Sequence, residues 1–365
     1  MRRYVFAVAW RVAALAALAI AILVLPRYVG VFRANQFALV GIFFIALLGL
    51  NIVTGHAGQI SLAHGAFMAI GGYTTAILVS GGPTLGEPLN LWPNALEGGV
   101  RDLWTIPLAG LAAALAGFLF ALPALRLTGL YLALATFAIA VATPAVLAKP
   151  AEITGGSRGI QLFGLPELSG KGFEQVGFLG HDVPFEDFVY YVTWLIAAAL
   201  FAAAWLMLNG RIGRAFRAVR DSEVAAAASG VNPAAYKTLA FAVSAFYAGV
   251  AGSLYVILNW GAAPRSFPVL LSIQLLIGLV VAGLGSLGTL VLGALFIQFL
   301  PEAIRRSGDL GLLPDALQRW GDEPGAPNVV FGAVLVTLVL LLPTGAAGLP
   351  RRAAAALTSR RYSQS

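Results

Sequence analysis

Apolar blocks close to 20 residues long recur along the whole chain of 365 residues. A helix needs about 20 such residues to cross roughly 30 Å of hydrocarbon. Because only 11% of the residues are charged and the mean hydropathy is +0.85, a water-facing surface of this size is excluded. The blocks are also too long and continuous for the short alternating strands of a membrane barrel. The sequence therefore predicts an all-α polytopic membrane protein, with residues 1-365 forming one transmembrane domain.

Ten blocks qualify as candidate spans. The third is rich in glycine and the eighth and ninth are short, so broken or re-entrant helices are expected among these three. The first follows a basic N-terminus but lacks a small-residue cleavage site and contains Arg11, so it is expected to remain as an uncleaved span. In chain order the blocks cover residues 8-25, 36-53, 59-80, 104-122, 129-148, 188-208, 237-258, 268-284, 287-300 and 327-345.

Positive charge is concentrated in two parts of the chain. Four arginines fall within residues 211-220, and four more follow the last apolar block. Loops rich in Lys and Arg stay on the cytoplasmic side of a membrane. With ten spans, this rule places both termini and the loop 209-236 in the cytoplasm. Short turns near residue 55, at 123-128 and at Gly285 then lie on the same side, and 149-187 is an extracytoplasmic loop.

A polar, glycine-rich stretch runs from residue 51 to residue 73. At membrane depth each polar group needs a partner, because burial without one is costly. Glycines permit helix breaks that expose backbone dipoles to a substrate in mid-membrane, and two of the side chains, at i and i+3, would share one face of a helix. The stretch is predicted to line a substrate pathway, with tight interhelical packing as the alternative. The candidate residues are Asn51, Thr54, Gly58, Gln59, Ser61 and His64, of which Ser61 and His64 are the helical pair.

The loop 209-236 has the features of a short docking helix. Gly213 can start and Gly230 can stop a helix of about four turns, and Pro233 supports the stop. Residues 224-228 would form a smooth surface of small side chains. Such a charged, low-bulk helix between two spans fits a groove on a cytoplasmic partner, whereas an ordinary cationic loop that only enforces topology is the alternative. The charged residues on one face, at i, i+3 and i+7, are Arg214, Arg217 and Asp221.

Composition argues against several functional classes. The chain has no cysteine, which excludes disulfides, Cys-ligated metals and thiol catalysis. It has only three histidines and no P-loop motif. Gly283-Leu-Gly-Ser-Leu-Gly288 matches the dinucleotide-binding pattern, but it lies between apolar blocks with no strand before it. Lys and Arg form no extended basic face for nucleic acid. No catalytic residue, metal, cofactor or nucleic-acid partner is therefore expected.

Two stretches have the character of family motifs. One is Gly58-Gln-Ile-Ser-Leu-Ala-His-Gly-Ala-Phe67, and the other begins Gly213-Arg-Ala-Phe-Arg-Ala-Val-Arg-Asp-Ser-Glu223. Together with weaker matches such as Gly129-Leu-Tyr-Leu-Ala-Leu, they resemble the branched-chain amino acid ABC permease family in order from about residue 50 to 345. The His64 region and the basic start of the inner loop resemble the M-type permease more than its H-type partner.

The resemblance implies an importer built from several chains in a bacterial or archaeal cell (inner) membrane. This chain would pair with a second, H-type permease, two cytoplasmic ATP-binding subunits and a periplasmic or lipid-anchored substrate-binding protein, all in contact with membrane lipid. ATP hydrolysis would occur on the partner chains, and the cargo would be a branched-chain or related amino acid. Tyr131 joins the pathway residues. In the loop 209-236, the expected ATPase-coupling residues are Arg214, Arg217, Arg220, Asp221, Glu223 and Gly230.

Three other functions remain open at this point. The same family includes importers that resemble transporters of urea, short amides or other amino acids. Specificity in these importers resides largely in the external binding protein, so the sequence of the permease leaves these cargoes open. An autonomous channel or secondary carrier is a second possibility, although the spans lack the buried acids and lysines typical of proton-coupled carriers. An integral-membrane enzyme would need acid, base or metal ligands clustered at membrane depth, and the sequence offers isolated His and Ser residues instead.

Overall fold

A computed structural model describes residues 30-80, 101-127, 129-162, 176-178, 181-183 and 185-309, together with the isolated residues 329, 332, 333 and 337. The first candidate span, 8-25, lies outside the described residues. So do nearly all of the last span, 327-345, and the C-terminal arginines.

Within the described residues, almost all regular structure is helical. Six of the helices are long and apolar enough to cross a membrane, which makes the chain a multi-pass membrane protein. Eight main helices build the described structure, and all of them except α3 and α14 are among these six. They are α2 (Val31–Leu50), α3 (His64–Ser80), α5 (Thr105–Ala124), α6 (Leu130–Leu147), α9 (Phe185–Asn209), α12 (Pro233–Leu258), α13 (Val269–Ala282) and α14 (Leu290–Asp309). The shorter helices are η1 (Asn51–His56), η2 (Arg101–Trp104), α7 (Ala151–Thr154), η3 (Gly156–Arg158), α10 (Arg211–Asp221), α11 (Glu223–Ala228) and η4 (Pro264–Ser266).

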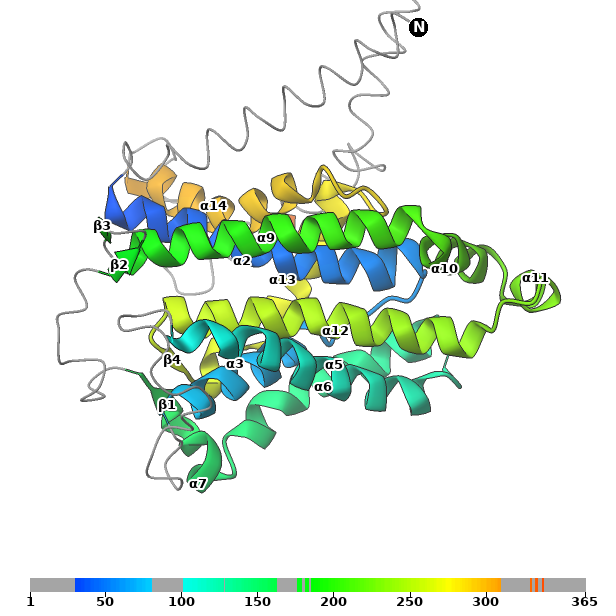
Figure 1. Ribbon diagram of the computed structural model, residues 1–365, viewed down its shortest axis with the longest axis horizontal. Helices are drawn as coiled ribbons and strands as arrows, with labels where there is room; N and C mark the ends of the chain where they lie inside the picture. The colour runs from blue at the N-terminus through cyan, green and yellow to red at the C-terminus, as the bar shows by residue number, and fades with distance from the viewer. Residues whose placement is uncertain are drawn as a thin grey trace, which may run out of the picture.

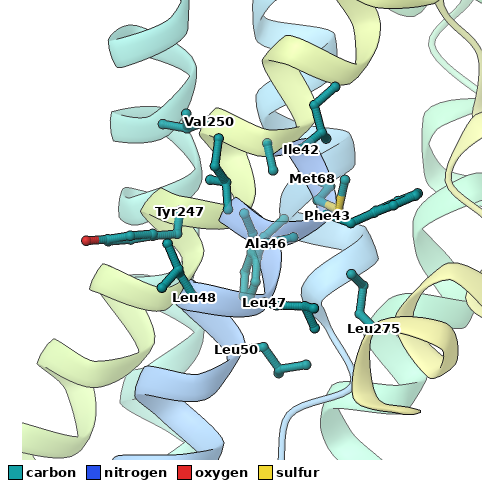
Figure 2. Packing of buried hydrophobic residues seen from close by; sticks show 14 of the residues in the cluster. Ile42, Phe43, Ala46, Leu47, Leu48, Leu50, Met68, Tyr247, Val250 and Leu275 are labelled. Atoms are coloured by element: carbon teal, nitrogen blue, oxygen red, sulfur yellow. The ribbon is translucent and has the colours of Figure 1, made fainter. Parts of the chain in front are cut away.

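The long helices form a bundle in which α12 is central (Figure 1). It packs on α5 and α3 on one side and on α2 on another, while α2 also packs against α9 and α14. Figure 2 shows the resulting core, where Ile42, Ala46 and Leu47 of α2 lie beside Met68, Val250 and Leu275. Helix α2 is therefore a buried helix that reaches lipid little, whereas α6 and α9 expose apolar faces.

Short β-pairs and the helix pair α10 and α11 lie at opposite ends of the bundle (Figure 1). At one end, β1 (Ile160–Gln161) pairs antiparallel with β4 (Gly261–Ala262), and β2 (Val176–Phe178) pairs with β3 (His181–Val183). At the other end, α11 projects beyond the long helices. The described parts of the loop 149-187 are thus separated from the loop 209-236 by the length of the bundle, as opposite faces of a membrane require. The compartment that each face meets remains a prediction.

Glycines bring three helices into close contact. A Cβ added at Gly252 of α12 would overlap the carbonyl oxygen of Met68 on α3, and one added at Gly71 would overlap Gly249. On its α5 side, Gly249 leaves room for the carbonyl of Ala109, which would lie 2.7 Å from an added Cβ. Such small-residue contacts are how helices associate in lipid, where no hydrophobic force drives them together.

The third candidate span is a broken one, as its glycines indicated. The sequence predicted a span over 59-80, but α3 begins only at His64, and residues 58-63 have no helical structure. The preceding span is longer than predicted, because a π-helical turn extends α2 to His56. The α13 and α14 helices match the predicted eighth and ninth spans, with α14 continuing to Asp309.

Candidate functional site

The break after α2 is built around Asn51. Its Oδ1 accepts a hydrogen bond from the Gly285 amide at 2.8 Å, and its Nδ2 donates to the Ser286 carbonyl at 3.3 Å. The fit depends on Gly55, where an added Cβ would overlap the Asn51 side chain. Asn51 therefore ties the π-helical turn to the connection between α13 and α14. Single π-helical turns are frequent at functional sites.

Residues 58-63 form an extended segment at this break. Gly58 has a φ of +71°, which turns the chain back toward the bundle at little steric cost. Thr54 Oγ1 donates to the Gln59 carbonyl at 3.0 Å, and the Leu62 amide donates to Thr136 Oγ1 of α6 at 3.0 Å. Gln59 and Ser61 are buried, while Ile60 is 45% exposed. The segment thus alternates like a strand, with its polar side chains directed inward.

Three side chains of this region keep buried polar atoms that have no hydrogen-bond partner among the described residues: Gln59 Oε1, Ser61 Oγ and both ring nitrogens of His64. Their exposed fractions are 6%, 1% and 0%. The His64 ring lies against Gly49 of α2, near the carbonyl of Ala46, but no regular hydrogen bond joins them. Leaving such groups unpaired costs about 1–3 kcal/mol each. Each such group therefore needs a partner from outside the chain, such as an ordered water or a passing solute.

The prediction that Ser61 and His64 share a helical face is wrong. His64 is the first residue of α3, but Ser61 precedes the helix in extended backbone. The backbone is not helical there because Gly58 turns the chain, and the Gln59 carbonyl and the Leu62 amide are hydrogen-bonded to the side chains of Thr54 and Thr136. Both side chains are nevertheless buried in the same short stretch, so the prediction placed them together for the wrong geometric reason.

Gln59 also lines a small recess between α5, α6 and α12. The recess has a volume of about 10 Å³, which is about the room that one water molecule needs. Lys237 lines it from the start of α12, and its Nζ lies 2.5 Å from Glu223 Oε1 of α11. Lys237 therefore lines the same recess as Gln59 and also pairs with Glu223 of the loop 209-236, so it connects the pathway stretch to that loop.

The loop 209-236 folds into two helices and not the single helix that the glycines predicted. Ser222 interrupts it with extended backbone, φ −163° and ψ 116°. The reason is local: the Ser222 side chain accepts a hydrogen bond from the Ala225 amide and so caps a new helix. The predicted stop is confirmed, since the backbone at Gly230 has a φ of +81°.

Helix α10 folds back onto the end of α9. Phe216 is fully buried, and Arg217 Nη1 donates to the Leu208 carbonyl at 3.2 Å. A Cβ added at Gly213 would overlap the backbone of Leu208, so this close approach needs a glycine. Arg214 points to the exposed side. The first helix of the loop is therefore a fixed platform on the bundle.

Helix α11 presents small side chains to the outside. Val224 is 80% exposed, and Ala225, Ala227 and Ala228 are exposed as well, while Ala226 is buried. The ion pair between Glu223 and Lys237 fastens the base of α11 to α12. The surface of Val224, Ala225, Ala227 and Ala228, called the α11 tip below, is small, apolar and held in place.

The remaining predicted residues do not share one location. Arg220 pairs with Asp221, Nε to Oδ1 at 3.1 Å, and also donates to the Gly55 carbonyl at 3.0 Å. Tyr131 is 72% exposed on α6 and joins none of the buried polar atoms above. Asn51 and Thr54 are committed to backbone contacts at the break. Gln59, Ser61 and His64 are thus the predicted pathway residues that retain free polar atoms.

Sequence reasoning missed the partners that fix this region. Thr136 on α6 supports Leu62, and Ser272 on α13 accepts from the Gly65 amide at 2.9 Å. Gly285 and Ser286 belong to the Gly-Leu-Gly-Ser-Leu-Gly motif, which the structure places in the connection between two apolar helices. The motif was visible, but nothing in the sequence linked it to Asn51, more than 200 positions away. Among the described residues, no group of three His, Asp or Glu side chains is placed to hold a metal.

Comparison with known proteins matches most of the chain to one family. The family described as "Branched-chain amino acid transport system / permease component" matches residues 32–342. The high-affinity branched-chain amino acid transport system permease protein LivM of Escherichia coli (strain K12) is 33% identical over 286 residues, which cover 74% of this chain and 63% of LivM. LivM of Salmonella typhimurium gives the same values.

A second curated relative is more distant. The permease protein LivH of E. coli (strain K12) is 24% identical over 332 residues, covering 88% of this chain and 94% of LivH. The chain therefore spans less than two thirds of the length of the LivM relatives but nearly all of the length of LivH. No solved structure matches the chain significantly.

Proposed function

The chain belongs to the permease family of branched-chain amino acid transport systems, and from that membership we propose that it is a transmembrane subunit of an ATP-driven importer for branched-chain or related amino acids. Its identity to LivM is higher than its identity to LivH, so it is the M-type permease that the motifs indicated. The observation that carries the proposal is the family match over residues 32–342, which includes both the broken α2–α3 region and the α11 tip.

The substrate pathway in this proposal runs along residues 58-63 and the start of α3. Gln59, Ser61 and His64 offer buried polar atoms that no other residue in the described part of the chain pairs with. A zwitterionic amino acid needs weak polar and backbone contacts to pass, because paired charges in a membrane would trap it. Irregular backbone at membrane depth is also tolerated only where it faces protein or a water-filled path. Asn51 and Thr54 then shape the pathway, and Gly58 lets it turn.

Coupling to ATP is assigned to the loop 209-236, which we place in the cytoplasm. The α11 tip is low in bulk and exposed, and α10 fixes it to the bundle, so a partner that grips α11 would move α9, α10 and α12 together. A groove on each ATP-binding subunit is the matching surface. The chain has no P-loop, so hydrolysis falls to these partner chains. An H-type permease and an external binding protein complete the assembly.

Reconstitution decides between this importer and an autonomous carrier. The full-length chain, its second permease and its ATP-binding subunits are inserted into liposomes with the binding protein outside, and uptake of radiolabelled leucine is measured. Leucine uptake is expected to require both ATP and the ATP-binding subunits. Equal uptake by the chain alone, without ATP, would contradict the proposal. ATP-dependent uptake of urea or a short amide in place of leucine would instead assign the chain to a urea or short-amide importer.

The same liposomes test the pathway assignment. Ser61→Ala removes a buried hydroxyl that has no partner, so the stability of the chain should be unchanged or slightly higher, while leucine uptake falls several-fold. Ser272→Ala is the matched control, because its hydroxyl accepts the Gly65 amide. It should lower the melting temperature. Full uptake by Ser61→Ala would show that Ser61 does not line the path.

A further inference from the structure

Arg220, in the last turn of α10, touches both sides of the break between α2 and α3. Its Nη1 donates to the carbonyl oxygen of Gly55 at 3.0 Å. The methylene carbons of the same side chain lie against Gly58, where an added Cβ would overlap Arg220 Cγ. The guanidinium thus holds the end of the π-helical turn, and the stem covers the first residue of the extended segment.

The contact extends to a third part of the chain through Gly55. An added Cβ at Gly55 would overlap Asn51 Oδ1 and would lie 2.7 Å from the Gly285 amide nitrogen. The Asn51 side chain is itself bonded to Gly285 and Ser286. Gly55 thus contacts Arg220 through its carbonyl oxygen and packs directly against the Asn51–Gly285 pair. No side chain fits between Gly55 and that pair, so a displacement of Gly55 by Arg220 would be passed to Asn51 and Gly285.

Charge and geometry both favour arginine at position 220. A guanidinium that donates to the last carbonyls of a helix is a charge-assisted bond in the favourable direction of the helix dipole. Asp221 Oδ1 accepts from Nε at 3.1 Å and so fixes the orientation of the planar group. Lysine would supply the stem but not the fork. Arg220 has a 40% exposed side chain, so it is reachable from the cytoplasmic partner while its tip is inserted at the break.

We propose that Arg220 is the positioning residue that transmits movement of α10 to the pathway, through Gly55 and Asn51 to the connection between α13 and α14 and through Gly58 to residues 58-63. The proposal rests on the proposed function, since it describes how a gripped loop 209-236 would act on the path. If Arg220 only held α10 against the bundle, its loss would affect Gly55 but not Gly285 and Ser286. Arg217 holds α10 in this way, at Leu208.

Hydrogen exchange on the full-length chain in lipid nanodiscs tests the linkage without any partner. In Arg220→Met, which keeps an apolar stem and loses the guanidinium, exchange of the Gly285 and Ser286 amides is expected to rise about fivefold. Arg126→Met, at an exposed arginine after α5, is the matched control and should leave these amides unchanged. Faster exchange confined to residues 51-58, with Gly285 and Ser286 unaffected, would overturn the linkage.

Reconstituted complexes test its consequence. Arg220→Met is expected to retain its ATP-binding subunits and their ATP hydrolysis, while leucine taken up per ATP hydrolysed falls about tenfold or more, and Arg220→Lys should recover only part of it. An unchanged ratio in Arg220→Met would contradict the proposal. Wild-type uptake that needs no ATP would instead contradict the proposed function, and the exchange experiment would still decide the linkage on its own.

Discussion

Gly252→Val is expected to destabilise the folded bundle. The first added carbon overlaps the Met68 carbonyl of α3, and that atom is backbone and cannot rotate away. Helices α3 and α12 would have to separate along a contact that also includes Gly71 and Gly249. Overpacking of this kind costs about 3 kcal/mol or more. Because the entropy of unfolding grows with chain length, this cost corresponds to a fall of about 4 °C or more in the melting temperature for a chain of 365 residues, measured by thermal unfolding in detergent.

Gly288→Val is the control for this prediction. Gly288 has no atom within 4 Å of an added Cβ and no left-handed backbone, so the same substitution should leave the melting temperature within about 2 °C of wild type. Equal melting temperatures of Gly252→Val and Gly288→Val would contradict the close approach of α3 and α12 at Gly252.

Val224→Asp is expected to release the ATP-binding subunits. Val224 is the most exposed large apolar residue at the α11 tip, at 80%. Once a partner covers the tip, a carboxylate there would be buried without a counter-charge. A penalty of about 3 kcal/mol weakens association roughly 100-fold. Pull-down of the ATP-binding subunits with the purified permease pair, followed by titration of the subunits, measures the loss.

Leu284→Asp provides the comparison. Leu284 is also an exposed apolar residue, at 55%, but it lies between α13 and α14 and outside the loop 209-236. It receives the same charge and should keep its ATP-binding subunits. Equal binding by Val224→Asp and the wild type would remove the α11 tip as the contact surface, even if the family assignment stands.

The sequence could predict the parts of this protein that depend on local composition. Apolar length predicted the helices, and the glycines around position 58 predicted that the third span is broken. The capping glycine at 230 was predicted because it needs only its own backbone conformation. The loop 209-236 was identified by its charges and alanines, although Ser222 divides it into two helices because a side-chain cap competes with continuing the first helix.

The rest depends on contacts between distant residues. Asn51 was assigned to the pathway as a polar residue that needs a partner at membrane depth, but the sequence did not identify Gly285 and Ser286 as the partners of its side-chain amide. Ser61 and His64 were placed on a helical face that does not exist, since the extended backbone is supported by Thr136 on another helix. Helix packing through Gly71, Gly249 and Gly252 has no local signature beyond small residues. These features follow from tertiary contacts, which one sequence does not display.

Side-specific labelling tests most directly the claim that the loop 209-236 faces the cytoplasm. The chain has no cysteine, so Ala228→Cys on the α11 tip and Ser157→Cys near β1 each provide a single thiol, both at exposed positions at opposite ends of the bundle. A membrane-impermeant maleimide added to intact cells is expected to label Ser157→Cys and to label Ala228→Cys only after the membrane is opened. Labelling of Ala228→Cys in intact cells would place the loop outside and contradict the account of both topology and energy supply.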